Sequence, residues 1–161
     1  MKKLLLLIAL SFVFAGCSQT ASPNKSHDAQ HNHLDETKGD IQQTTASTDE
    51  LPSFVTNKPE TTQLAYKLAA KNDKLLQQIP CYCGCGESAG HKHNADCFVK
   101  EVKPGSVMWD SHGTKCGVCM AIAVESVKLQ SEGKSVKEIR SYIDTKYSSN
   151  GMKPTPTPMP N

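Results

Sequence analysis

The stretch from Pro80 to Gly86 reads PCYCGCG and places three cysteines at alternating positions. Glycines beside the thiols allow the chain to fold back, so thiolates spaced by two or three positions can converge on one ion. Thiolates are preferred ligands of zinc and of Cu(I). The stretch therefore predicts a metal site built on a loop, with these ligands: Cys81, Cys83 and Cys85.

Further side chains of the kind that bind soft metals follow this stretch. They are Cys97, Cys116, Cys119, His91 and His93. The pair Cys116-Gly-Val-Cys119 has the spacing of one half of a zinc or copper site, with the PCYCGC thiols as the other half. Tetrahedral zinc needs only four ligands, so six thiols favour copper ahead of zinc, either as a thiolate cluster or with a disulfide beside the metal. Cys97 ranks before the histidines because a thiolate matches a soft ion better than an imidazole does.

Two other uses of these thiols also fit the sequence. In an oxidising compartment an even number of cysteines is typical of a disulfide-stapled module, which here would bind another envelope protein. Cys81, Cys83 and Cys85 would each need a distant partner, since extended residues two apart are poorly placed to bond to each other. Thiol–disulfide exchange is the other use, because a C-x-x-C at a helix start lowers the pKa of its first thiol.

The N-terminal residues indicate export from the cytoplasm. Lys2 and Lys3 precede an apolar run from Leu4 to Ala15, which is too short for a comfortable membrane span and is typical of a secretory signal. Small residues follow directly before Cys17, and this arrangement resembles the lipobox of bacterial lipoproteins. The resemblance implies cleavage before Cys17, a lipid on its sulfur, and anchoring to the cell membrane on its extracytoplasmic face.

Composition divides the chain into four segments. Residues 1–16 form the lipoprotein signal peptide, 17–57 the lipidated cysteine and a flexible polar tether, 58–150 a cysteine-rich helical domain, and 151–161 a Pro-rich tail. The tether has few large apolar residues to bury, and the alternation of proline in the tail predicts an extended, unpacked end. The tether also holds three histidines, which we interpret mainly as solvated polar residues: His27, His31 and His33.

Three helices are expected in the cysteine-rich domain. Apolar residues recur at helical spacing over 60–79 and again from Cys116 until Gly133, and Ser135 with Glu138 predicts a capping box before a helix over 136–147. Residues 98–113 show too little periodicity for assignment, and fit a short strand or extended segments with a turn at Pro104-Gly105. The expected fold is therefore mainly α: a small three-helix domain with a cysteine-rich loop.

Charge argues against a nucleic-acid partner. The sequence has 18 Lys+Arg and 16 Asp+Glu, and removal of residues 1–16 takes away Lys2 and Lys3 alone, which leaves 16 of each. The basic residues are spread out and lack interleaved aromatic residues, so we expect no nucleic-acid binding. No Ser/His/Asp set or paired-carboxylate site stands out, so we do not expect a hydrolase.

The order of motifs adds a resemblance that spans most of the chain. A lipobox, a polar tether, PCYCGCG, a His-x-His, an Asp-Cys-Phe and a Cys-Gly-x-Cys resemble the bacterial lipoproteins named after the PCYCGC motif. That resemblance implies an exported, membrane-anchored, cysteine-dependent protein without naming a substrate. A shorter one, CGVC followed by GKSVKEIRSYIDTKY, is similar to thiol-oxidoreductase subunits of cytochrome c maturation and implies thiol exchange or haem handling as the alternative. We expect an anchored lipoprotein that binds copper or zinc.

Overall fold

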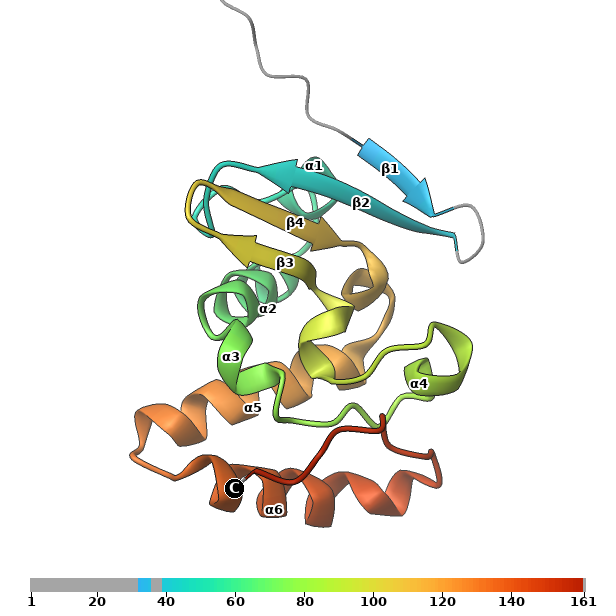
Figure 1. The fold of residues 1–161 in the computed structure, drawn as a ribbon, viewed down its shortest axis with the longest axis vertical. Coiled ribbons are helices and arrows are strands. Elements are labelled where there is room, and N and C mark those ends of the chain that lie inside the picture. Colours follow the sequence, from blue (N-terminus) through green and yellow to red (C-terminus); the bar gives the residue numbers. More distant parts are fainter. Residues whose placement is uncertain (1–31, 36–38, 161) are drawn as a thin grey trace, which may run out of the picture.

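The protein combines helices with a sheet, as Figure 1 shows for the computed structural model. The structure describes residues 32–35 and 39–160. This part of the chain contains six α-helices, three short 3-10 helices and a four-stranded antiparallel sheet. The expectation of a mainly α, three-helix domain is therefore wrong, and the fold is mixed α and β. Within the described ranges, no helix is both long and apolar enough to cross a membrane.

The sheet has the strand order β1-β2-β4-β3. Its strands are β1 (Asn32–Asp35), β2 (Asp40–Thr45), β3 (Val99–Lys103) and β4 (Ser106–Asp110). Strands β3 and β4 form a hairpin around Pro104 and Gly105, and Gly105 adopts the left-handed φ of +75° that this tight turn uses. The segment without clear periodicity therefore holds strands on both sides of the expected Pro-Gly turn.

Strand β2 comes from the polar segment that was expected to be a tether. Its sequence, DIQQTT, lacks a hydrophobic alternation, yet Gln43 and Thr45 are buried. Thr45 Oγ1 accepts a hydrogen bond from Trp109 Nε1 at 2.8 Å, and Gln43 Oε1 accepts from the backbone N and the hydroxyl of Ser53 at 2.8 Å each. Buried polar groups are tolerated when hydrogen-bonded, and these partners are distant in sequence. The structured domain thus begins well before residue 58.

The three expected helices are present, the first two with altered limits. The helices are α1 (Ser53–Thr56), α2 (Glu60–Lys71), α3 (Asp73–Leu76), α4 (Cys85–Ser88), α5 (Gly117–Ser131) and α6 (Val136–Tyr147), and the 3-10 helices are η1 (Asn94–Cys97), η2 (His112–Lys115) and η3 (Ser148–Asn150). The first expected helix is divided at Asn72, whose φ of −121° departs from helical geometry. Helix α6 begins as predicted, because Ser135 and Glu138 form the capping box.

An aromatic cluster joins α2 to the sheet. Tyr66, Phe98 and Trp109 are all fully buried, and the rings of Tyr66 and Phe98 meet nearly at right angles with centroids 5.1 Å apart. The Tyr66 hydroxyl donates to the carbonyl of Asp110 at 2.8 Å, which satisfies its only polar atom. Figure 1 shows the sheet at one end of the molecule and α6 at the other, with the cysteine-rich loop between them.

The C-terminal tail is packed against the domain, so the expectation of an unpacked end is wrong. Thr155 and Thr157 are buried, whereas the prolines around them up to Pro158 are exposed. Alternate residues of an extended chain face the same side, so the Pro-Thr alternation turns both threonines toward the protein. Arg140 Nη1 donates to the carbonyls of Thr157 at 3.1 Å and Pro158 at 3.0 Å. Figure 1 shows this segment between α6 and the cysteine-rich loop.

Candidate metal centre

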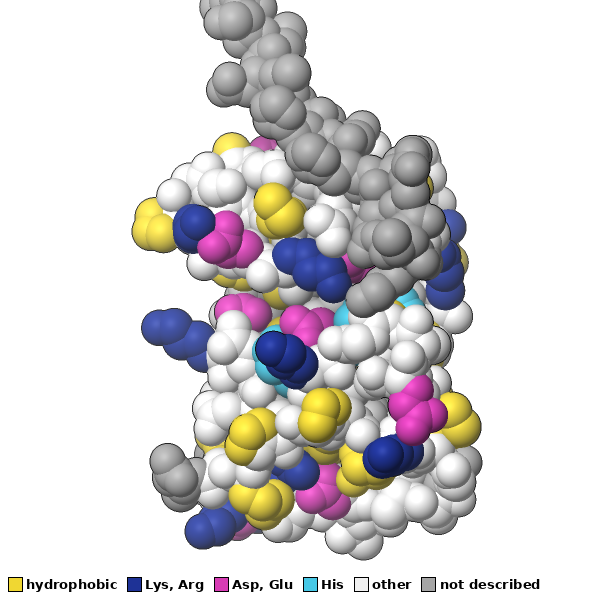
Figure 2. Space-filling model, turned by 45° about the vertical axis from the view of Figure 1, so that its right-hand side comes forward, with side chains coloured by type: hydrophobic (Ala, Val, Ile, Leu, Met, Phe, Trp, Pro, Cys, Tyr) yellow, Lys and Arg dark blue, Asp and Glu magenta, His cyan; other side chains and the backbone are white. Residues whose placement is uncertain are grey.

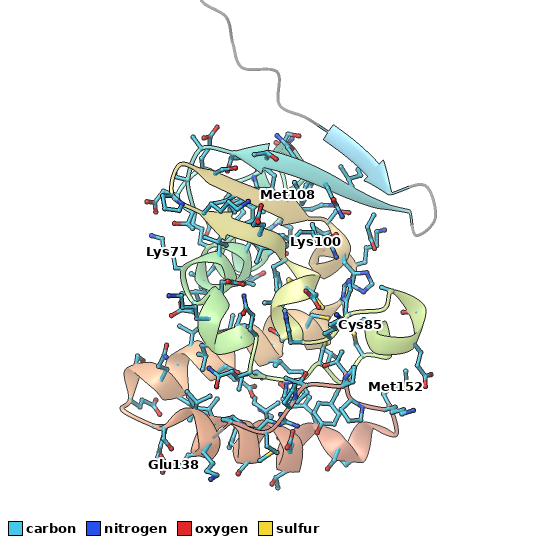
Figure 3. The ribbon with its side chains drawn as sticks, in the orientation of Figure 1. Lys71, Cys85, Lys100, Met108, Glu138 and Met152 are labelled. Carbon is cyan, nitrogen blue, oxygen red and sulfur yellow. The ribbon has the colours of Figure 1, made fainter. Side chains whose placement is uncertain are left out.

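The PCYCGC loop, residues 80–86, leaves the end of α3 and turns back at Gly84. Gly84 has a φ of +81°, in the left-handed region that a residue with a Cβ avoids. The turn allows Cys85 to begin α4 while the two preceding cysteines stay in the extended part of the loop. Cys119, in the first turn of α5, approaches the loop from the opposite side. Figure 3 shows Cys85 on the side of α4 that faces the body of the protein.

Three sulfur atoms form a nearly equilateral triangle. The distance between Sγ atoms is 3.4 Å for Cys81 and Cys83, 3.2 Å for Cys81 and Cys119, and 3.3 Å for Cys83 and Cys119. Cys85 adds a fourth sulfur, and all four Sγ atoms lie within 4.8 Å of one another. The six cysteines of the described residues are free thiols, so no disulfide competes for these sulfurs there. We refer to these four residues as the thiol cluster.

The thiol cluster fits a soft metal ion. Zn–S bonds of about 2.3 Å give a tetrahedron with an S–S edge of about 3.8 Å. The triangle, with edges of 3.2–3.4 Å, would therefore expand slightly around an ion. All four donors are thiols. Cu(I) and zinc bind such ligands well, whereas hard cations prefer oxygen ligands. Cys81 and Cys119 are fully buried and Cys85 almost so, while Cys83 is partly exposed. A buried all-sulfur site with one accessible ligand can hold an ion and still exchange it.

The other two predicted thiol ligands lie at the edge of the thiol cluster. Cys97, at the end of η1, is fully buried, and its Sγ lies 3.8 Å from that of Cys85 and 3.4 Å from Nδ1 of His91. Cys116 is the N-cap residue of α5 and is partly exposed. The proximity of its thiol is the main cause that lowers the pKa of the Cys83 thiol. Both residues therefore support the cluster from its periphery.

Only one of the two predicted histidine ligands reaches the centre. His91 is buried, and it forms with Cys85 and His112 a second group whose ligand atoms lie within 4.8 Å of one another. His93 points instead toward Asp96, with Nδ1 3.7 Å from the carboxylate, and belongs to neither group. In Figure 2 the histidine side chains visible on this face are small patches among lysines and acidic residues.

Two functional candidates were missed in the sequence-based site. His112 lies in η2, and its signal was its place, with His91 and His93, in the stretch between Cys81 and Cys119 that is dense in cysteine and histidine. Asp40 accepts from His112 through an Oδ2–Nδ1 contact of 2.9 Å and from Lys115 Nζ at 3.0 Å. Burial raises the pKa of Asp40, but these two hydrogen bonds and the adjoining charges lower it overall. Asp40 is therefore an ionised partner for His112, supplied by a strand assigned to the tether.

The close packing of the thiols shifts their pKa values in different directions. Hydrogen bonds from Cys116 and then Cys119 lower the pKa of Cys83, which favours its thiolate. Hydrogen bonds with Cys116 and Cys81 raise the pKa of Cys119, which keeps that thiol protonated. The pKa of His112 rises to about 9, first through its hydrogen bond with Cys83 and, against the effect of burial, through Asp40. A metal ion bound by these thiols would take the place of the shared protons as the positive charge in the centre.

The predicted lipobox with Cys17 and the predicted signal peptide fall outside the described residues, as do residues 18–31 and 36–38 of the polar segment that follows. A family model with the description "Protein of unknown function with PCYCGC motif" matches residues 6–160, which is nearly the whole chain. Neither a curated protein nor a solved structure matches it. The matched range includes Cys17, the thiol cluster and the C-terminal segment.

Proposed function

The chain belongs to the family of proteins with a PCYCGC motif, and on that premise we propose that it is a membrane-anchored extracytoplasmic lipoprotein that binds a soft metal ion through its thiol cluster. The observation that carries this proposal is the triangle of sulfur atoms from Cys81, Cys83 and Cys119, with edges of 3.2–3.4 Å. Two of these residues come from one loop and the third from a helix distant in sequence. Side chains so placed supply a ready set of thiolates for one ion.

Copper is the first candidate and zinc the second. A donor set made only of sulfur favours Cu(I), the softest of the common biological ions, while four thiolates also satisfy tetrahedral zinc. The two extra thiols, Cys97 and Cys116, exceed what one zinc ion requires and add further soft donors at the edge of the cluster. The number of thiols in and around the centre therefore supports copper ahead of zinc.

The proposed anchor is the lipid on Cys17. It would hold the centre at the outer face of the cell membrane. There the protein would encounter metal ions that leave or enter the cell. Cys83 is the partly exposed thiol of the cluster, so it is the ligand through which an incoming thiolate or thioether donor can replace a protein ligand. We therefore expect the protein to pass its ion to, or receive it from, another carrier rather than to bury it permanently.

Thiol–disulfide exchange is the second candidate function, because Cys116 lies at the start of α5 and is partly exposed. The pKa of the Cys116 thiol argues against this exchange function and favours metal binding. Although the hydrogen bond with Cys119 lowers the pKa of Cys116, the hydrogen bond with Cys83 and burial raise it overall. An attacking thiol needs a sizeable thiolate fraction, which a raised pKa reduces.

Metal titration of the reduced protein tests the proposal. We would use the chain from residue 17 with Cys17→Ser, add Cu(I) or Zn²⁺, and follow sulfur-to-metal charge transfer for copper and bound metal by native mass spectrometry. The matched control is the double variant Cys83→Ser/Cys119→Ser, which removes two corners of the triangle. Tight binding that the control loses is expected. Equal binding by both proteins, together with three disulfides in protein isolated from cells, would contradict the proposal in favour of a disulfide-stapled module.

A further inference from the structure

Cys85 faces two groups of ligand-type side chains. On one side lie the other sulfurs of the thiol cluster, and on the other lie His91 and His112, with all three ligand atoms of this second group within 4.8 Å of one another. The imidazole rings of His91 and His112 meet edge to face with centroids 4.5 Å apart. Two imidazoles and a thiol therefore converge at a point that adjoins the sulfur triangle.

Asp40 holds His112 in the orientation of a metal ligand. A carboxylate can only accept, so His112 Nδ1 carries the proton of the 2.9 Å contact with Asp40 Oδ2. This leaves Nε2, the nitrogen available to the thiol of Cys83, as the one that would bind a metal ion once its proton is displaced. Metal-binding histidines commonly donate their other N–H to a carboxylate in this way, which fixes the tautomer and increases ligand basicity. Lys115, at 3.0 Å from the other Asp40 oxygen, fixes the carboxylate in turn.

His91 is fixed by its neighbours as well. It is 4% exposed, and its backbone N–H donates to the carbonyl of Cys85 at 3.2 Å, so the two ligand-type residues belong to one tight turn around α4. Its Nδ1 lies 3.4 Å from the sulfur of Cys97. A buried histidine whose Nδ1 lies beside a thiol and whose ring contacts another imidazole has surroundings typical of a ligand rather than of a surface base.

We propose that Cys85, His91 and His112 bind a second metal ion beside the thiol cluster, with Asp40 as the positioning residue of His112 and Cys85 as a ligand common to both sites. Two imidazoles and one thiolate form a donor set of intermediate softness, which suits a borderline divalent ion such as Zn²⁺ rather than Cu(I). Because Cys85 is shared, this inference rests on the proposed function and deepens it. The protein would then hold a two-ion centre, of which the sequence pattern indicates only the sulfur part.

The test counts ions in the reduced chain from residue 17 with Cys17→Ser. The tether histidines are replaced in every sample so that they cannot contribute: His27→Gln, His31→Gln and His33→Gln. After saturation with Zn²⁺ and removal of free metal, native mass spectrometry should find two ions in this parent protein. His112→Ala should retain one ion, and His93→Ala, which changes a histidine of the same loop outside both groups, should retain two. Asp40→Asn should weaken binding of the second ion by about 10- to 100-fold.

The outcomes separate the two hypotheses. One ion in the parent, lost in Cys119→Ser and kept in His112→Ala, would overturn the second site and leave the proposed function intact. Absence of bound metal in the parent would overturn both. Circular dichroism checks that His112→Ala folds. If this variant does not fold, Co²⁺ titration of the parent tests the second site instead. A second equivalent with new d–d absorption and little added sulfur charge transfer supports a site of mixed ligands, and saturation at one equivalent overturns it.

Discussion

Thr155 and Cys81 are joined by two hydrogen bonds. The backbone N–H of Thr155 donates to the carbonyl of Cys81 at 2.9 Å, and the backbone N–H of Cys81 donates to the Thr155 hydroxyl, also at 2.9 Å. Both residues are buried. The C-terminal segment is therefore a structural support of the first cysteine of the thiol cluster, although the two lie 74 residues apart in sequence.

Thr155→Val should destabilise the PCYCGC loop. The substitution keeps the shape of the side chain but leaves the buried N–H of Cys81 without its acceptor, a change that costs about 1–3 kcal/mol of unfolding free energy. Metal affinity should fall as well, because the loop loses a fixed point at its first ligand. Denaturant unfolding and Zn²⁺ titration measure the two effects. Thr145→Val, which removes an exposed helical hydroxyl, is the control, and equal behaviour of the two variants would refute the role of Thr155.

Gly84→Ala should impair metal binding more than a comparable glycine replacement elsewhere. A Cβ at Gly84 meets a left-handed φ of +81° and would stand 2.5 Å from Met152 Cε, whereas Gly133 has a φ of +84° with open space around it. Both alanines should cost about 1–2 kcal/mol through backbone strain. Only Gly84→Ala should also lower Zn²⁺ affinity, because it displaces the turn between Cys83 and Cys85. Met152 lies beside this turn in Figure 3.

Comparing Gly84→Ala with Gly84→Ala/Met152→Ala separates the two causes. Removal of the methionine side chain should restore part of the lost stability by relieving the contact, while the cost of the backbone strain remains. Thermal melts of the two proteins and of Gly133→Ala provide the measurement. If Gly133→Ala reduces metal affinity as much as Gly84→Ala does, the local explanation fails.

Chelation should loosen the loop without unfolding the protein. Metal binding contributes to folding free energy where ligands come from separate elements, here the loop and α5. The aromatic cluster of Tyr66, Phe98 and Trp109 is built from other residues and should persist. Addition of a strong chelator should lower the melting temperature and increase amide exchange around Cys83. The fluorescence maximum of Trp109, the single tryptophan, should remain unchanged, and a red shift to that of unfolded protein would contradict this view.

Truncation should locate the true start of the domain. Deletion of residues 18–31 should leave the melting temperature nearly unchanged, because this polar segment offers little to bury. Deletion of residues 18–51 should lower it markedly, since β2 and its buried hydrogen bonds to Trp109 and Ser53 are lost. Both deletions keep Cys17 and can be compared in the same Cys17→Ser background. Equal melting temperatures would show that β2 adds nothing to stability.

Cys17→Ala should abolish lipid attachment. The proposed lipobox offers this cysteine as the acylated residue, and one lipidated N-terminus would be the membrane determinant of the mature chain. Cells grown with labelled fatty acid should incorporate label into the parent and not into Cys17→Ala, which should accumulate as precursor or appear in the soluble fraction. Cys116→Ala is a control for cysteine loss as such. Equal labelling of Cys17→Ala and the parent would contradict the anchor.

The sequence by itself determined the local features of this protein. The capping box of Ser135 and Glu138 and the helix over residues 136–147 follow from side chains three or four positions apart, and the helix has the predicted limits. The candidate ligands of the PCYCGC stretch also follow from spacing, because thiols two positions apart beside glycines can converge on one ion. Such features depend on neighbours in sequence, so they can be inferred before any contact is known.

Tertiary structure decided the composition of the centre. His112 rather than His93 reaches it, because a hydrogen bond to Asp40, 72 residues away, holds the His112 ring in place. The polar side chains of β2 are buried because distant parts of the chain, such as Trp109, hydrogen-bond to them, and the Pro-Thr tail is packed because Cys81, Arg140 and Lys92 offer partners. Polar residues show no hydrophobic periodicity, and whether they are buried depends on partners that the folded chain alone brings within hydrogen-bond distance.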